Sequence, residues 1–184
     1  IDIGAGTVDF CIMHGTMPNE EDQRSLFNAG DFIDQQLYNL LAENYPQTDV
    51  TLMMVRKIKE EHAFVGDVRG KVEVDLPVHG KFITHDIGSE FRRACESIMP
   101  GIVETAIDMI ARFDPEYQER VRNNIILAGG GSQITGIDAY LNGLMRDFAP
   151  CRFTLVKDPL YAGALGALEL ANDMPKEYWE DISA

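Results

Sequence analysis

The chain has 184 residues, of which 45% are hydrophobic and 25% charged, a composition that argues for a folded globular protein and against a disordered or fibrous one. Its 30 acidic and 16 basic residues give a formal net charge of -14, which disfavours binding to nucleic acid or to acidic lipid surfaces. No apolar run of the sequence is long enough to span a bilayer, so we expect no direct membrane insertion.

The first part of the chain predicts two strands and then two helices. Apolar and polar residues alternate over 7–13, which favours a strand, and 24–27 is a second candidate strand. Leucine and isoleucine at helical spacing then predict a helix over 30–44. Asp49 is the expected N-cap of the next helix, which runs toward His62.

The middle of the chain predicts a small inserted unit. Residues 71–84 alternate in the manner of two short strands, and the segment 77–80 supplies the turn between them. Together with the two preceding helices, these strands are expected to form an α+β subdomain over 30–85.

The downstream part alternates between helices and strands, which is typical of the α/β class. Residues 87–113 carry an apolar stripe at helical spacing, and this predicts a helical stretch capped by Asp86 and divided at Pro100. The other expected elements are a short helix from 114, a strand at 124–128, a loop at 129–132, a helix at 138–148, a strand at 153–156 and a helix at 159–172. The predicted division is a core subdomain at 1–29 and 86–157, the inserted subdomain at 30–85 and a C-terminal helical segment at 158–184.

The cysteines, histidines and first residue of the chain bear on its cellular setting. Cysteine and histidine are scattered without the spacing of a disulfide framework or a zinc site, which favours a reducing cytoplasm. The chain begins with Ile1 instead of methionine, three residues before its first glycine-rich turn. We therefore expect the first strand to be cut and further residues of the same protein to precede it.

The first of two glycine-rich turns has the sequence Asp-Ile-Gly-Ala-Gly-Thr-Val-Asp and spans 2–9. Two glycines let a backbone turn tightly and direct its N–H groups at an anion, and the carboxylate of Asp2 could hold a water on a phosphate-bound magnesium ion. No Gly-Lys-Ser/Thr follows, and Asp9 stands where a dinucleotide fingerprint has its third glycine, so both of those motifs are excluded. On this pattern alone, a tight hairpin without a ligand is an equally good interpretation.

The second glycine-rich turn follows a buried strand and has the sequence Ile-Leu-Ala-Gly-Gly-Gly-Ser over 126–132. In open α/β sheets, ligands bind outside the carboxyl ends of strands, and backbone without side chains lets a base or sugar approach closely. A flexible loop between a strand and a helix is the alternative for this turn.

Taken together and in this order, the two turns resemble the second phosphate loop and the adenosine loop of the actin, Hsp70 and sugar-kinase superfamily. Within that superfamily the chain is similar to the bacterial actins, because 28–31 opens a helix after the first turn and 156–167 resembles the second interdomain connection. The tail at 173–179 is similar to that of the bacterial actins that form magnetosome-organising filaments. The resemblance implies an actin-like ATPase fold of the ribonuclease H-like type, present here as its second domain only.

The resemblance also implies a site for ATP and Mg²⁺. Asp2 matches the family aspartate that lies near magnesium and contacts it through water, and it is the catalytic residue expected in this chain. The hairpin around the phosphates is matched by Gly4, Ala5, Gly6 and Thr7. The residues that match nucleoside-binding positions are Gly30, Asp31, Lys59, Glu60, Gly129, Gly130, Gly131 and Ser132. For Lys59 and Glu60, an ordinary charged helix face is an almost equally good interpretation.

The function implied by the resemblance is that of a cytoplasmic, ATP-binding cytoskeletal protein that self-associates into filaments, positions magnetosomes in chains and contacts magnetosome-associated proteins. The first phosphate loop and the water-positioning residue of the family have no counterpart in this chain, which leaves hydrolysis by the chain alone open. Two alternatives remain: an ATPase domain of the chaperone or sugar-kinase type, and a truncated interaction module that does not hydrolyse ATP. In the family, the last helix packs on the other half of the molecule, so we expect Leu160, Leu165 and Leu168 to be exposed.

Overall fold

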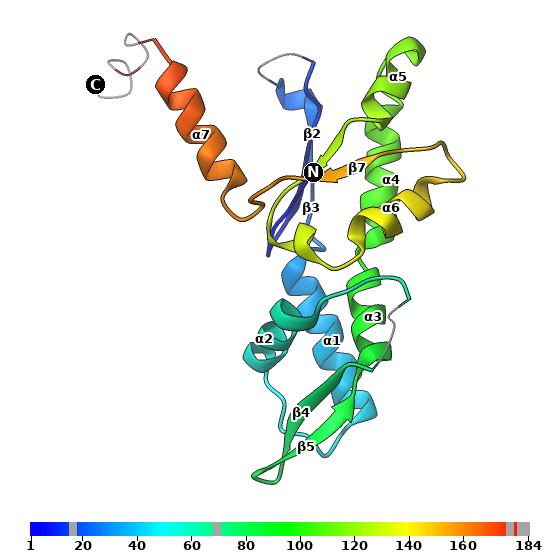
Figure 1. Ribbon diagram of the computed structural model, residues 1–184, viewed down its shortest axis with the longest axis vertical. Coiled ribbons are helices and arrows are strands. Elements are labelled where there is room, and N and C mark those ends of the chain that lie inside the picture. The colour runs from blue at the N-terminus through cyan, green and yellow to red at the C-terminus, as the bar shows by residue number, and fades with distance from the viewer. Residues whose placement is uncertain (15–17, 68–70, 176–178, 180–184) are drawn as a thin grey trace.

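The computed structural model describes residues 1–14, 18–67, 71–175 and 179. Figure 1 shows an elongated molecule with two stacked parts: a sheet with helices above, and a group of helices with a β-hairpin below. Residues 176–178 of the tail, on which part of the family resemblance rests, lie outside the described residues.

The upper part is organised around a continuous surface of strands, in which the sheet β1-β2-β3 is bridged to the pair β6-β7 between Asp2 and Ala128. Its strands are β1 (Asp2–Ile3), β2 (Val8–Cys11), β3 (Gln23–Leu26), β6 (Ile125–Leu127) and β7 (Phe153–Leu155). The first three are antiparallel, whereas β6 and β7 are parallel. The Ile3 amide donates to the Ala128 carbonyl at 2.9 Å, and the Ala128 amide donates to the Ile1 carbonyl at 2.8 Å. The short strand β1 therefore joins the two halves of the sheet.

Helices cover one face of this sheet. They are α4 (Met99–Ile110), which packs on β3, and α6 (Ile137–Met145), which packs on β7, while α5 (Pro115–Arg122) follows α4. The side chains of β2 accordingly alternate between buried and exposed: Val8 and Phe10 are buried under the helices, and Asp9 is exposed on the other face. Ile126 of β6 is 51% exposed on that same open face.

The lower part contains α1 (Gly30–Asn44), α2 (Leu52–His62), β4 (Glu73–Val78), β5 (Lys81–Asp86) and α3 (Gly88–Glu96). Helix α1 packs against both α2 and α3, and the β4–β5 hairpin forms the lower end of the molecule (Figure 1). The hairpin turn is shorter than the predicted 77–80, because Pro77 is paired with Phe82 inside the ladder. His79 and Gly80 form the turn, and both have positive φ, as a two-residue turn between twisted strands requires.

The N-cap of α2 differs from the prediction. Thr51 is the cap residue, and its hydroxyl accepts a hydrogen bond from the Met54 amide at 3.3 Å. Asp49 instead connects the helix start to the hairpin, since its amide donates to the Pro77 carbonyl and its carboxylate accepts from the His79 amide. Both residues are good caps by type, and the hairpin decides which one is used.

The predicted division of the long helical stretch is confirmed. Helix α3 ends at Glu96, α4 begins at Met99, and Pro100 occupies the first turn of α4, where a missing N–H costs nothing. Asp86 accepts a hydrogen bond from the Gly88 amide at 3.2 Å, although Ile87 is the residue at the cap position. The predicted extent of the three subdomains stays a prediction.

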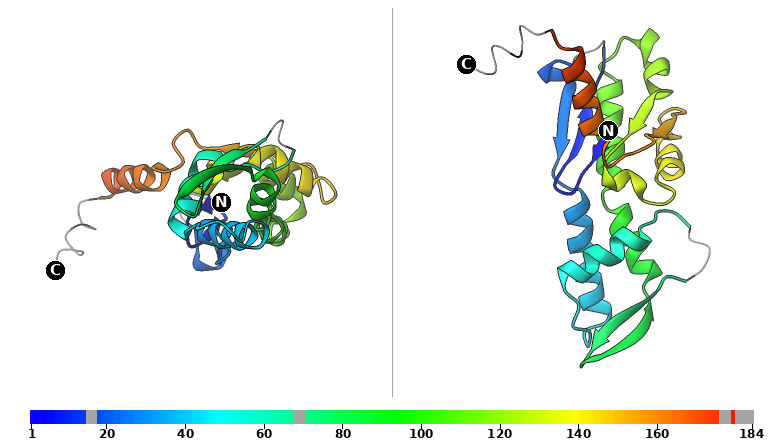
Figure 2. Two further views of the ribbon diagram at one scale, coloured as in Figure 1. Left: turned by 90° about the horizontal axis from the view of Figure 1, so that it is seen from below. Right: turned by 60° about the vertical axis from the view of Figure 1, so that its left-hand side comes forward.

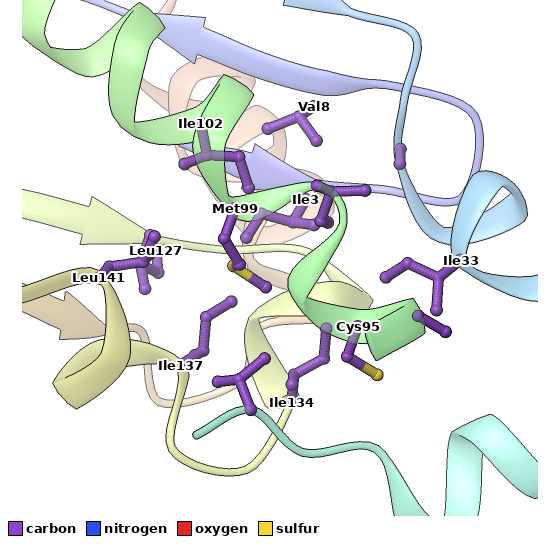
Figure 3. Close-up of a cluster of buried hydrophobic side chains, with 14 of the residues drawn as sticks. Ile3, Val8, Ile33, Cys95, Met99, Ile102, Leu127, Ile134, Ile137 and Leu141 are labelled. Atoms are coloured by element: carbon purple, nitrogen blue, oxygen red, sulfur yellow. The ribbon is translucent and has the colours of Figure 1, made fainter. Parts of the chain in front are cut away.

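A shared hydrophobic core joins the two parts of the molecule. Figure 3 shows side chains from the sheet, from the lower helices and from the covering helices meeting in one cluster. Its members include Ile3, Val8, Ile33, Cys95, Met99, Ile102, Leu127, Ile134, Ile137 and Leu141, all buried. Because Ile33 comes from α1 and Leu127 from β6, the sheet and the lower part are held together by apolar packing.

The last helix, α7 (Ala162–Asp173), projects away from the rest of the chain in Figure 1 and in the left view of Figure 2. It buries none of its residues. Leu160, Leu165 and Leu168 are 62%, 50% and 57% exposed, as expected from the sequence. Among the described residues, no helix has the length and apolar character needed to cross a membrane.

Candidate functional site

The first glycine-rich turn is a tight hairpin seated on the start of α1. The Gly4 amide donates to the Thr7 carbonyl at 2.9 Å and closes the turn. The turn also accepts two hydrogen bonds from the start of α1. The Gly30 amide donates to the Gly4 carbonyl at 3.1 Å, and the Asp31 amide donates to the Ala5 carbonyl at 2.7 Å. A Cβ at Gly30 would lie 3.1 Å from the Gly4 oxygen, so glycine permits this close contact.

The tip of this hairpin offers free hydrogen-bond donors. Ala5 and Gly6 are exposed, and within the described part of the chain neither of their amides donates a hydrogen bond. A Cβ at Gly6 would meet no atom within 4 Å, so open space surrounds the tip. Unpaired amides on a tight, side-chain-poor turn are the donors that phosphate oxygens accept from.

Two carboxylates lie beside the turn on the open face of the sheet. Asp2 and Asp9 are directly opposite each other in the β1–β2 ladder, and both are exposed. Asp9 accepts hydrogen bonds from the Thr7 hydroxyl at 2.7 Å and from the Ser25 hydroxyl at 2.5 Å. Like charges directly opposite each other destabilise a strand pair, so the two carboxylates repel each other across β1 and β2.

Sequence reasoning missed Asp9 and Ser25. A signal for Asp9 was present, because a hairpin turn at 4–7 places residues 2 and 9 opposite each other and on the same face of the sheet. Ser25 has no such signal, since the pairing of β3 with β2 depends on the loop between them.

The second glycine-rich turn is packed tightly against β1. Gly129 is buried with φ of 78°, and a Cβ there would collide with the Asp2 carboxylate and lie 2.5 Å from the Ile3 carbonyl oxygen. A Cβ at Gly131 would collide with the Ile3 side chain. Gly129 and Gly131 are thus required by packing, and the packing brings this loop next to Asp2.

The two other residues of this loop have different settings. Gly130 is exposed, has no positive φ, and would place a Cβ no closer than 3.4 Å to Leu160. Ser132 is fully buried, and its hydroxyl donates to the Gly129 carbonyl at 2.8 Å. Gly130 is therefore the residue of this loop that faces outward, while the Ser132 side chain holds the loop together.

An ion-pair network fixes the start of α1. The Lys59 ammonium donates to the Gly30 carbonyl at 2.8 Å and lies 2.8 Å from the carboxylate of Asp34, whose side chain is only 4% exposed. Arg56 reaches the same carboxylate at 3.2 Å and Asp31 at 2.6 Å. The hydrogen bond to Asp34 and the charge of Asp31 raise the pKa of Arg56 above its ordinary value.

This network explains part of the predicted nucleoside set. Lys59 is 15% exposed and is bound to Gly30 and Asp34, so its contacts position the helix that carries the hairpin. Glu60 is exposed on α2. Asp34 and Arg56 were not predicted, although Asp31 with Asp34 and Arg56 with Lys59 have the three-residue spacing that places side chains on one helix face.

The predicted residues converge around β1 and the start of α1. Asp2 contacts the Gly129 loop, the hairpin of Gly4 to Thr7 follows β1, and Gly30 and Asp31 are hydrogen-bonded to that hairpin. A cavity of about 890 Å³ is lined by Asp2 and Asp9 but by none of the glycines of the two turns. Of the two turns, Ala5, Gly6 and Gly130 are exposed to solvent, and Gly129 is buried.

A family model described as MreB/Mbl protein matches residues 1–178 of this chain. The chain belongs to the MreB/Mbl family. Curated relatives in this family include the actin-like protein MamK of Paramagnetospirillum magneticum, which is 38% identical over 182 residues, covering 99% of this chain and 52% of the relative. MamK of Magnetospirillum gryphiswaldense is 39% identical over 179 residues, covering 97% of this chain and 50% of the relative. The chain thus spans about half the length of these relatives.

Solved structures confirm the predicted actin-like fold. A MamK double helical filament has a TM-score of 0.91 at 39% identity and covers 95% of this chain and 54% of that one. A non-polymerising MamK mutant bound to AMPPNP has a TM-score of 0.87 at 39% identity, and the match covers 94% of this chain and 53% of that one. Membership of the MreB/Mbl family places the chain with the bacterial actins and away from the chaperone and sugar-kinase alternative.

Proposed function

We propose that this chain supplies one half of the ATP site of a polymerising actin-like protein. The observation that carries the proposal is the hairpin at Gly4 to Thr7, whose tip has unpaired amides and which is joined to the start of α1 and, through β1, to the Gly129 loop. Support comes from the relative whose structure contains AMPPNP, an ATP analogue, and from the relatives that form filaments.

Each part of the site has a distinct task in this proposal. The amides of Ala5 and Gly6 donate to phosphate oxygens, and Asp9 holds the Thr7 hydroxyl in place beside them. Gly130 offers a surface without a side chain for the base or sugar. The buried Lys59–Asp34 pair keeps the start of α1 pressed against the hairpin.

The residues beside the turn fit a Mg²⁺ ion bound to phosphate. Mg²⁺ prefers oxygen ligands and retains several of its waters, and Asp2 and Asp9 present carboxylate oxygens on an open, solvated face. Bound there, Mg²⁺ would neutralise phosphate charge. Asp2 would then orient a metal-bound water, and the charge repulsion between Asp2 and Asp9 would be relieved.

Hydrolysis needs more than these residues provide. Turnover requires an enclosed site with a positioned water and phosphate contacts from both sides. Here Ala5, Gly6 and Gly130 are exposed to solvent, so we propose weak nucleotide binding and no turnover above background by these 184 residues alone. Full-length protein should hydrolyse ATP with magnesium dependence, whereas turnover by the purified 184-residue chain that Asp2→Ala abolishes would contradict the proposal.

Photolabelling tests the site directly. An azido-substituted ATP analogue, crosslinked to the full-length protein with Mg²⁺ and mapped by mass spectrometry, should label peptides that contain 4–7, 30–31 and 129–131. Excess ATP should remove these labels. Labelling confined to other surfaces of the chain would refute the assignment of the site.

The assembly part of the proposal is that the lower part of the molecule contacts the neighbouring subunit in a filament. A head-to-tail contact that does not close produces filaments, and the β4–β5 hairpin with Phe82 70% exposed lies at the end of the long axis. Charge reversal at the exposed Lys57 should lower polymer yield more than ATP affinity. Arg69, the other basic residue predicted for this contact, lies outside the described residues.

A finer proposal concerns the cellular role. On the resemblance to MamK, the filament is cytoplasmic, associates with magnetosomes through magnetosome-associated proteins and arranges them in chains. Fluorescently tagged protein in a magnetosome-forming host should follow the chain of magnetosomes as a line. Diffuse fluorescence in cells that contain intact magnetosome chains would contradict this role.

A further inference from the structure

The outer face of α4 carries an apolar groove that the described residues leave uncovered. The inner face of this helix packs into the core through Ile102 and Ala106. Helix α6 packs beside α4 (Figure 1). The groove has a volume of about 360 Å³ and is lined by Pro100, Val103, Glu104, Ile107, Asp108 and Leu144.

The outer side of α4 carries apolar as well as charged residues. Its only charged residues are Glu104 and Asp108, and Val103 and Ile107 lie next to them on the outer side, half-buried. The outer side of a surface helix is normally polar, so apolar residues there favour contact with a further partner. Leu144 on the other wall of the groove is 41% exposed, so the uncovered apolar surface extends onto α6.

The rim of the groove is acidic. Glu104 and Asp108 are one helical turn apart, and within the described residues neither carboxylate forms an ion pair or a side-chain hydrogen bond. The next residue in the same row is Arg112, whose guanidinium donates instead to the Glu21 carbonyl at 2.9 Å. Two uncompensated negative charges therefore border an apolar floor.

We propose that this groove binds a short amphipathic helix of a basic partner protein. An apolar side chain of the partner would pack on Val103 and Ile107, and flanking Lys or Arg side chains would pair with Glu104 and Asp108. The floor from Pro100 to Asp108 is about 12 Å long at 1.5 Å per residue, which matches about two turns of a bound helix.

Charge complementarity selects this occupant over a second copy of the chain. A second copy carries a net charge of -14 toward an acidic rim, whereas a basic helix is attracted to it. The groove also lies on the helix-covered side of the sheet, and Asp2 and Asp9 lie on the open side. The partner and the proposed nucleotide would therefore occupy separate surfaces.

A synthetic helix of leucine and lysine, about 14 residues long with leucine at three- and four-residue spacing, is a direct probe. Its fluorescence anisotropy would be followed on titration with the full-length protein at physiological salt. Binding should weaken at least tenfold with the double variant Glu104→Lys and Asp108→Lys. The matched control, Glu116→Lys with Glu119→Lys on α5, makes the same charge change at exposed positions and should change the affinity less than twofold.

A second variant separates the groove from general charge attraction and from misfolding. Ile107→Ala keeps every charge and shortens one half-buried side chain, and it should weaken peptide binding three- to tenfold with an unchanged circular dichroism spectrum. Absence of peptide binding, equal weakening in the α5 control, or full affinity with Ile107→Ala would each overturn the proposal. If the groove variants change filament sedimentation but not peptide binding, the groove forms contacts between copies of the chain, and the proposal is overturned.

Discussion

In the turn from Gly4 to Thr7, the residues at the tip are exposed and their amides are unpaired, whereas in the loop from Gly129 to Gly131 the backbone is pressed against β1. Both segments contain closely spaced glycines; the hairpin directly follows β1, and the loop packs against Asp2 and Ile3 of that strand. At the tip of the hairpin, Gly6 has room for a side chain, and the anion binding proposed above gives a reason for the lack of one. The loop has no room for side chains at two of its three glycines, so it is chiefly the packing of the fold that excludes them.

The comparison predicts the largest effect at Gly129. Gly129→Ala should destabilise the protein by about 3 to 5 kcal/mol, because a Cβ would collide with Asp2 at a backbone φ of 78° that disfavours side chains. Thermal unfolding monitored by circular dichroism would measure it. Gly143→Ala, where a Cβ meets nothing within 4 Å, is the control. Equal stability of the two variants would show that the loop is not packed on β1 as described.

The buried ion pair behind the hairpin is the next test. Lys59→Met removes the partner of the buried Asp34 carboxylate and of the Gly30 carbonyl, and should cost about 1 to 3 kcal/mol of stability, with Arg56 still paired to Asp34. Glu60→Gln, at the adjacent exposed residue, should leave the free energy of unfolding unchanged in urea titrations. A loss of nucleotide affinity in Lys59→Met without a loss of stability would instead support a direct ligand contact.

Gly130 should separate ligand binding from folding. At Gly130 the backbone has no positive φ and a Cβ meets only Leu160, so Gly130→Val should fold while ATP affinity falls at least tenfold, or about 1.4 kcal/mol. Calorimetric titration with ATP and Mg²⁺ measures the affinity, and Gly143→Val serves as the control for an added branched side chain. Unchanged affinity in a folded Gly130→Val variant would remove the nucleoside assignment of this loop.

The smallest expected effect is at Asp9, beside the open hairpin. Asp9→Asn keeps hydrogen-bonding atoms near Thr7 and Ser25 and removes one of the two opposed charges. The affinity for ATP with Mg²⁺ should fall roughly threefold to tenfold, about 0.7 to 1.4 kcal/mol, and the affinity for ATP in EDTA should rise or stay constant. Ser25→Ala is the control that loosens Asp9 but keeps its charge. An equal loss with and without Mg²⁺ would argue against a cation at this position.

How far the sequence predicts this molecule depends on the range of the interaction involved. Local signals are sufficient for the helix division at Pro100 and for the hairpin over 4–7, because each depends on residues within one turn. They fail at Asp49, which is a good cap by type but is bound to the hairpin near Pro77 and His79. Tertiary contact, absent from a local pattern, decides between two adequate caps.

The same limit applies to the candidate site. Glycine spacing identifies both turns, and the superfamily resemblance supplies their pairing. Neither the glycine spacing nor the resemblance predicts that Gly130 faces outward while Ser132 is buried, because this depends on how β1 packs against the loop. Neither predicts that Lys59 is bound to Asp34, because this depends on how α2 packs against α1. Side-chain orientation within a motif is thus the part that only the folded arrangement reveals.

The central place of β1 also constrains the order in which the chain folds. Its pairing with β2 closes a turn of four residues, but its hydrogen bonds to the β6 segment join residues 125 positions apart. Contacts between residues so far apart in the sequence form late, because closing the loop between them costs entropy before the contact contributes any stability. During synthesis, the strands β1 to β3 and the whole lower part leave the ribosome before β6 does. Until β6 arrives, one edge of β1 stays unpaired and able to bond to another strand, so the rate at which residues 27–127 are synthesised sets how long the nascent protein is exposed to misassociation.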